Sequence, residues 1–227
     1  MIDNSRKIIT TEDGSHSLYM PELKEQYHSV HGALTESMHV FIHAGLRFSL
    51  AGRNTMNILE VGFGTGLNAL LTFKYALRNR ISVTYFAIEP FPIDSQIISQ
   101  LNYPDLNELE NTTAVFSAMH NAPFNVSSEI SEHFLLHKIS ERLEVYQPPS
   151  AFFDLVYFDA FSPAVQPELW TRDVFDIVAK SMKQGAVLVT YCCKGEVKRQ
   201  LRAAGFEVTK IPGPPGKREM IRAVKSA

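Results

Sequence analysis

The chain has 227 residues, of which 45% are apolar and 20% charged, with 12 glycines and 12 prolines. This composition is typical of a globular protein and excludes a disordered chain, a collagen and a disulfide-stapled miniprotein. The net charge of −2 lacks the basic excess of a dedicated nucleic-acid-binding protein. The charge is uneven, however: the segment from Lys194 onward holds nine basic and three acidic residues, +6, and the preceding 193 residues carry −8.

The start of the chain and its cysteines indicate the compartment. Residues 1–6 are mostly polar, and no apolar run approaches the ~18 residues that span a bilayer. We therefore expect a cytoplasmic protein. Cys192 and Cys193 are neighbours, so they cannot build a disulfide framework or a Cys-x-x-Cys metal site, and we expect free thiols.

Strand and helix signals alternate along most of the chain. The expected strands are 57–61, 83–88, 134–139, 153–158, 186–191, 206–211 and 220–224, and the expected helices are 67–77, 94–101, 106–119, 169–182 and 196–204. We expect Asp94 to cap its helix and Gly185 to close the helix 169–182. This order predicts an α/β fold with a Rossmann-like, mostly parallel sheet and an antiparallel C-terminal hairpin. Residues 1–56 form a predicted N-terminal cap on a domain of residues 57–227.

A glycine-rich loop follows the first strand of that domain. The residues from Gly62 to Gly66 read Gly-Phe-Gly-Thr-Gly and precede a helix whose free N–H groups can hold an anion. Glu89 ends the next strand, where a carboxylate can accept hydrogen bonds from both ribose hydroxyls. These features predict a nucleoside ligand with an acidic tail. The spacing Gly-x-Gly-x-Gly favours S-adenosylmethionine over a dinucleotide, whose fingerprint is Gly-x-Gly-x-x-Gly.

The end of the strand 153–158 supplies an acceptor-side motif, from Asp159 to Pro163. A carboxylate and the ring of Phe161 suit an amine acceptor, because a carboxylate can take a proton or hydrogen bond from the amine. The alternative is that Asp159 serves only as a turn or capping acid.

Several longer blocks resemble the methyltransferase domain of the bacterial tRNA 5-methylaminomethyl-2-thiouridine biosynthesis family (MnmC type). The blocks are Leu-Glu-Val-Gly-Phe-Gly-Thr-Gly-Leu-Asn at 59–68, Phe-Asp-Ala-Phe-Ser-Pro at 158–163, Pro-Glu-Leu-Trp-Thr at 167–171, Thr-Tyr-Cys at 190–192 with Lys-Gly at 194–195, and Gly-Pro-Pro-Gly-Lys-Arg-Glu-Met at 213–220. The resemblance covers most of the chain from residue 57 onward. It implies a class I S-adenosylmethionine-dependent methyltransferase that converts the aminomethyl group on the wobble uridine of tRNA to methylaminomethyl.

The resemblance also implies partners and site residues. Larger family members carry an FAD-dependent oxidase domain that makes the amine; this chain resembles the form without it, so the amine would come from a separate oxidase or another source. The implied cofactor residues are Glu60, Gly62, Phe63, Gly64, Gly66, Asn68, Glu89 and Asp159, and the implied catalytic residues are Asp159 and Phe161. Where the larger members have a Gly-Asp pair beside the adenine, this chain reads Lys-Ile-Ser-Glu at 138–141, so the adenine contacts are not assigned.

The substrate side is expected to draw on both ends of the chain. Lys194, Lys217 and Arg218 could reach phosphates of a tRNA anticodon stem-loop, although charged hairpin tips and helix faces are also commonly just solvated. Tyr27, His28 and His31 lie in a stretch that resembles the family's segment closing over the pocket. Histidine spacings there occur in metal sites, but no cysteine supports one and we expect no metal. Trp170 is expected to be a packing anchor.

Two other functions remain open on the sequence. One is an amine methyltransferase that acts on a free small molecule. The other is a non-catalytic S-adenosylmethionine-binding scaffold for a partner oxidase.

Overall fold

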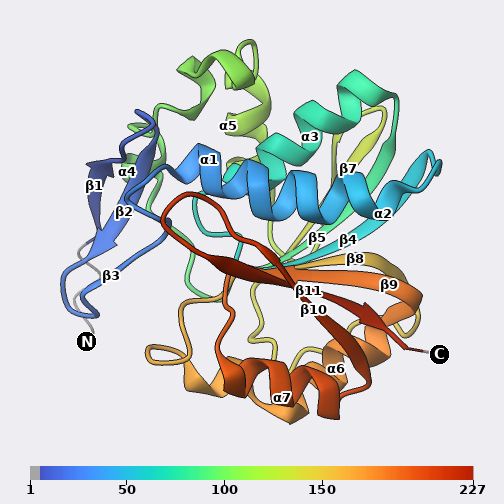
Figure 1. Ribbon diagram of the computed structural model, residues 1–227. Coiled ribbons are helices and arrows are strands. Elements are labelled where there is room, and N and C mark those ends of the chain that lie inside the picture. Colours follow the sequence, from blue (N-terminus) through green and yellow to red (C-terminus); the bar gives the residue numbers. More distant parts are fainter. Residues whose placement is uncertain (1–5, 227) are drawn as a thin grey trace.

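A computed structural model describes residues 6–226, and its centre is an eight-stranded sheet (Figure 1). The strand order is β10-β11-β9-β8-β4-β5-β7-β6, with β9, β8, β4, β5 and β7 parallel to their neighbours in that run. The strands are β4 (Thr55–Val61), β5 (Ser82–Ile88), β6 (Ser127–Ser131), β7 (Phe134–Ile139), β8 (Phe153–Phe158), β9 (Met182–Thr190), β10 (Phe206–Pro212) and β11 (Glu219–Lys225). The predicted fold class is confirmed, including the antiparallel hairpin of β10 and β11.

Helices cover both faces of the sheet, which explains why its central strands are mostly apolar. All six residues of β8 are buried. One face packs against α1 (Ala33–Ser37), η1 (Met38–Arg47), α2 (Phe48–Leu50), α3 (Leu67–Asn79) and α5 (Thr113–Asn121); the other packs against α6 (Arg172–Ser181) and α7 (Gly195–Ala203). Each face therefore has its own hydrophobic core.

The N-terminal segment consists of a small antiparallel sheet and one long helix. The sheet contains β1 (Lys7–Thr10), β2 (His16–Met20) and β3 (Glu25–Gln26). Residues 33–50 are continuously helical, and their central part, η1, is wound as a π-helix. A Cβ on Gly45 would lie 2.9 Å from Val189 Cγ2, so glycine lets this helix approach β9 closely. The predicted division at residue 56 stays a prediction, but Phe41, Ile42 and Leu46 are part of the main core.

Three local predictions differ from the structure. The predicted helix 106–119 is instead the turn η3 (Asn107–Leu109) followed by α5, and the edge strand β6 is not signalled by its polar sequence. The predicted helix 169–182 is the turn η4 (Pro167–Trp170) followed by α6, which ends at Ser181; Gly185 lies inside β9 rather than closing the helix. Its φ of +72° accompanies the register shift between β8 and β9.

Asp94 caps the short α4 (Ser95–Ile98) as predicted, accepting from Gln96 N.

Within residues 6–226, none of the helices combines the length and apolar character needed to cross a membrane.

Asp154 ties β8 to two other segments, and its removal provides a test of the fold. Its buried carboxylate accepts from Arg53 Nη1 at 3.0 Å, Asn57 N at 2.9 Å and Lys183 Nζ at 2.8 Å. We expect Asp154→Ala to lower the free energy of unfolding by about 2–3 kcal/mol, because the Asn57 N–H is left without an acceptor. Urea unfolding measures this. Asp176→Ala on the exposed face of α6 is the control, and an equal loss in both variants would contradict the prediction.

Candidate functional site

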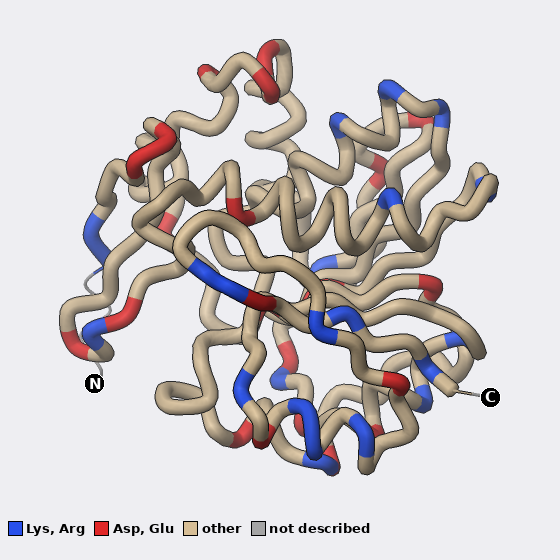
Figure 2. Tube along the Cα trace, in the orientation of Figure 1, with Lys and Arg blue, Asp and Glu red and all other residues tan. Residues whose placement is uncertain are grey.

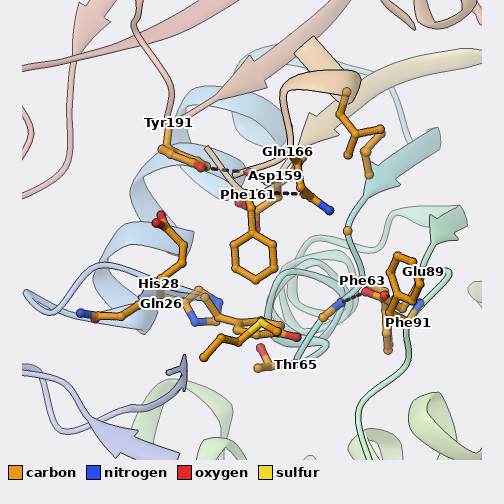
Figure 3. Close-up of a pocket in the computed structure, with 18 of the residues that line it drawn as sticks. Gln26, His28, Phe63, Thr65, Glu89, Phe91, Asp159, Phe161, Gln166 and Tyr191 are labelled. Carbon is orange, nitrogen blue, oxygen red and sulfur yellow. Dashed lines mark hydrogen bonds between the residues drawn. The ribbon is translucent and has the colours of Figure 1, made fainter. Parts of the chain in front are cut away.

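A cavity lies at the carboxyl ends of β4, β5 and β8, where the order of the strands reverses (Figure 3). It has a volume of about 770 Å³. Residues 20–31 of the N-terminal segment and the β10–β11 loop close it on the side facing away from the sheet. In an open α/β sheet this switch point is where ligands bind.

The glycine loop between β4 and α3 forms one wall. Gly62 has a φ of +92°, and a Cβ there would lie 2.7 Å from the carbonyl oxygen of Asp159. The loop therefore passes β8 at a distance that only glycine permits. Gly64 lies against the ring of Tyr27, and Phe63 and Thr65 also line the cavity. Gly66 caps α3 with a φ of +74° and does not line the cavity itself.

Glu89 meets this loop from the end of β5. Its Oε2 accepts from Gly64 N at 2.8 Å and its Oε1 accepts from Phe91 N at 2.9 Å. Burial raises the pKa of this carboxyl, and the two backbone donors oppose the rise. Each carboxylate oxygen keeps a further lone pair, so Glu89 can still accept from ligand hydroxyls.

A partly buried carboxyl and a fully buried one share a hydrogen-bond donor beside the glycine loop. Asn68 Nδ2 donates to Asp159 Oδ2 at 2.8 Å and to Glu60 Oε1 at 3.0 Å. Asp159 and Asn68 line the cavity, whereas Glu60 lies behind them with no exposed surface. Burial, followed by the charge of Glu36, raises the pKa of Asp159 to about 7. A carboxyl with this pKa can exchange a proton near neutral pH.

The loop after β8 is held rigidly around Phe161. The Phe161 N–H donates to Gln166 Oε1 at 3.0 Å, and its carbonyl accepts from Trp170 Nε1 at 2.8 Å. Tyr191 Oη donates to the neighbouring carbonyl of Ala160 at 2.9 Å. Figure 3 shows the Phe161 ring projecting into the cavity, where Tyr27 meets it edge-on at 5.1 Å. Trp170 is buried, which confirms its expected role as a packing anchor.

The N-terminal segment contributes the predicted Tyr27, His28 and His31, all of which line the cavity. Burial lowers the pKa of His28 to about 4, so its imidazole is neutral at pH 7, with Nδ1 3.0 Å from Ser17 Oγ. His31 Nδ1 instead lies 2.9 Å from Glu12 Oε2 near the surface.

Lys217 was predicted to reach tRNA phosphates, but its ammonium already has partners in the protein. It pairs with the buried Glu36 and lies 4.1 Å from the centre of the Tyr191 ring. Lys194 and Arg218 border a shallower hollow of about 300 Å³ next to the cavity, and Lys217 and Tyr191 line both. Neither Lys194 nor Arg218 forms an ion pair with a carboxylate of the described chain.

Other lining residues were not predicted. Arg6 donates to the carbonyls of Phe91 and Pro92, which fastens the N-terminal segment beside Glu89. Arg142, Leu143 and Glu144 line the cavity just after β7, the place where the sequence left the adenine contacts unassigned. Their only sequence signal was their position after a strand. No group of three or more ligand-type side chains that could hold a metal occurs within the described residues.

The cavity fits a nucleoside that carries an amino-acid tail and a cationic centre. The glycine loop permits close approach, Glu89 can hold ribose hydroxyls, and carboxyls favour a positive charge nearby. Asp159, Phe161 and Tyr191 line the same cavity as the glycine loop and Glu89.

Several known proteins are similar to this chain. A bifunctional tRNA 5-methylaminomethyl-2-thiouridine biosynthesis protein MnmC from Nitrosospira multiformis is 31% identical over 214 residues, which are 90% of this chain and 35% of the relative. The protein of the same name from Cupriavidus metallidurans is 33% identical over 226 residues, 93% of this chain and 33% of the relative. The chain thus spans about a third of the length of these curated relatives.

Solved structures share the fold. MNMC2 from Aquifex aeolicus superposes with a TM-score of 0.78 at 24% identity, covering 99% of this chain and 72% of that one. Spermidine synthase from Thermotoga maritima superposes with a TM-score of 0.54 at 12% identity, covering 97% of this chain and 72% of that one.

A family model described as S-adenosyl-L-methionine-dependent methyltransferase matches residues 110–226, from α5 to the end of β11. This match covers more than half of the chain, and the glycine loop, Glu89 and the strand order agree with the cofactor that the description names. The chain therefore belongs to the S-adenosyl-L-methionine-dependent methyltransferases, and S-adenosylmethionine is its cofactor.

Proposed function

We propose that this protein methylates the aminomethyl group on the wobble uridine of tRNA, giving 5-methylaminomethyl-2-thiouridine from the 5-aminomethyl form. One observation carries the proposal beyond the family: a single cavity joins the glycine loop to an acceptor end with a buried carboxyl and aromatic walls. That end suits an amine attached to a planar base. The relatives named for this modification support the same substrate.

The acceptor amine must be neutral before it can react. A free alkylamine has a pKa of about 10.4, so converting its ammonium form to the neutral amine at pH 7 costs about 4.6 kcal/mol. Asp159 is placed to reduce that cost, because its carboxylate can accept a hydrogen bond or a proton from the amine inside a desolvated cavity.

Bound S-adenosylmethionine supplies an electrophilic methyl group on its sulfonium sulfur. The amine nitrogen would take that methyl group while the sulfur keeps the bonding electrons, and Asp159 would accept the proton that the nitrogen loses and pass it to solvent. The protein contributes positioning and exclusion of water. Gly62, Phe63, Gly64, Asn68 and Glu89 would hold the cofactor, with Glu60 and Gly66 acting from behind that wall.

The aromatic walls would hold the base. Tyr27 and Phe161 meet edge-on beside the acceptor end, and aromatic rings stack on bases that leave their helix. A neutral His28 beside Ser17 adds a polar group that does not repel a cationic amine.

The tRNA backbone would meet the protein beside the hollow lined by Lys194 and Arg218. Figure 2 shows Lys and Arg positions along α7 and in the β10–β11 loop. Lys210 and Lys217 pair with carboxylates and Lys225 donates to the carbonyl of Met182, so these three are not counted as phosphate contacts. The aminomethyl group itself must come from an earlier reaction, which a separate oxidase could perform.

The proposal is tested with labelled S-adenosylmethionine and tRNA that lacks this methylation. After incubation, mass spectrometry of the digested nucleosides should place the label on the wobble uridine. Transfer to free amines but not to tRNA would favour a small-molecule methyltransferase. Cofactor binding without transfer to either acceptor would favour a scaffold.

Asp159→Asn should lower methyl transfer by about 100-fold or more while the cofactor still binds, since an amide cannot accept the proton. In the wild type the rate should rise as pH passes about 7, and this step should be absent in the variant. Rates measured between pH 5.5 and 9 test this, with Asp176→Asn as the control. A variant that retains wild-type rates would refute the acceptor role.

The same substitution should raise the stability of the fold above pH 7, although it lowers the rate of methyl transfer. Because burial raises the Asp159 pKa from 3.8 to about 7, the folded wild type holds an extra proton between these values. Its stability therefore falls as pH rises through this window. Asp159→Asn lacks that loss, so its urea midpoint should exceed that of the wild type more at pH 8 than at pH 5; a constant difference would contradict the expectation.

Lys194→Gln combined with Arg218→Gln should weaken tRNA binding and reduce its salt dependence. Each lost phosphate contact lowers the slope of log K against log salt by about 0.7–0.9, so we expect a decrease of about 1.5. Binding titrations at several salt concentrations measure the slope. The control pair is Arg78→Gln at the far end of α3 with Lys180→Gln on α6. Equal slopes in both double variants would place the RNA elsewhere.

A further inference from the structure

A side-chain amide joins the Asp159 carboxyl in the cavity wall to the buried Glu60 carboxyl behind it. Asn68 is the second residue of α3 and is 4% exposed. Its Nδ2 lies 2.8 Å from Asp159 Oδ2 and 3.0 Å from Glu60 Oε1. An amide nitrogen carries two hydrogens, so it can donate one to each carboxyl, whereas the amide oxygen could donate none. In this orientation one amide group serves both carboxyls.

Glu60 accepts from the Asn68 amide on Oε1, and the hydroxyl of Tyr85 is a second polar neighbour. Glu60 is fully buried in β4, and within the described chain its Oε2 has no hydrogen-bond partner. Burial raises the pKa of Glu60 well above its usual range, and the carboxyl of Asp159 adds to the rise. This environment therefore favours the uncharged form of Glu60.

We propose that Asn68 and Glu60 are positioning residues for the acceptor step: Glu60 orients the Asn68 amide, and Asn68 holds the Asp159 carboxyl where it meets the amine. This inference rests on the proposed function of Asp159. In this role Glu60, the buried acid of β4, does not contact the cofactor, which agrees with its absence from the cavity lining.

The bridge also biases the charge on Asp159. The Asn68 hydrogen bond lowers the pKa of Asp159, against the larger effects of burial and Glu36. The titratable and charged groups around Asp159 come from five elements: Glu60 on β4, Tyr85 on β5, Glu36 on α1, Tyr191 after β9 and Lys217 in the β10–β11 loop. Of these, Lys217 is the cation, and it pairs with Glu36. Among the described residues, the group that donates a hydrogen bond directly to the Asp159 side chain is the Asn68 amide.

The test compares Asn68→Ala and Asn68→Asp with Asn79→Asp, an exposed residue at the other end of α3. Asn68→Ala should lower kcat by about 10- to 100-fold with a KM for tRNA within about threefold of wild type, because a hydrogen bond to a charged group is lost. The acid limb of the kcat profile should move to higher pH. Asn68→Asp should move it further, since a third carboxyl faces Asp159. Asn79→Asp should behave as wild type.

A second readout does not depend on catalysis. Titration of the Asp159 carboxyl by ¹³C NMR, with its signal assigned from Asp159→Asn, should give a higher midpoint in Asn68→Ala than in wild type. Asn68→Ser keeps a hydroxyl donor, so its midpoint should lie between those of wild type and Asn68→Ala. It takes the place of the alanine variant in the comparison with wild type if that variant does not fold. Equal midpoints and equal kcat in the Asn68 and Asn79 variants would overturn the inference. A wild type that transfers no methyl to tRNA while the NMR shift is present would instead reject the proposed function alone.

Discussion

The partly buried carboxyl group of Asp159, just after β8, is the constraint on which the site depends. Asp159 needs shielding from water for its pKa to lie near 7, yet it needs a hydrogen bond to stabilise its charged form. Asn68 supplies that hydrogen bond, and the hydrogen-bonded loop around Phe161 fixes the backbone that follows Asp159. Gly62 makes the arrangement possible, because any side chain there would collide with the backbone of Asp159.

The cavity is completed by segments from opposite ends of the chain. The N-terminal segment and the β10–β11 loop are joined by the pair of Lys217 with Glu36 and by His39, whose Nε2 lies 2.9 Å from the carbonyl oxygen of Pro212. Asp13 anchors the N-terminal turn to the start of α1 by accepting from the backbone and hydroxyl of Thr35, both at 2.8 Å. These contacts join the N-terminal segment to the β10–β11 loop, and both segments line the cavity.

The distribution of charge follows from the same arrangement. The acidic body of the molecule holds the carboxyls that suit a sulfonium and an amine, and the basic C-terminal part borders the cavity mouth. Three lysines of that part are committed to contacts within the protein. The surplus available to a polyanion is therefore smaller than the count of +6 indicates, and two of its members, Lys194 and Arg218, lie beside the cavity.

Local patterns in the sequence were sufficient for the parallel sheet, the glycine loop, Glu89 and Asp159, because strand ends and glycine turns depend on near neighbours in the chain. They failed for β6 and for the helix expected at 106–119, where polar residues and short turns leave no periodic signal. Only the tertiary structure decided that Lys217 pairs with Glu36, 181 residues away, and that Glu60 lies behind Asn68 rather than in the cavity. Such contacts depend on how distant segments pack, and spacing along the chain carries no information about them.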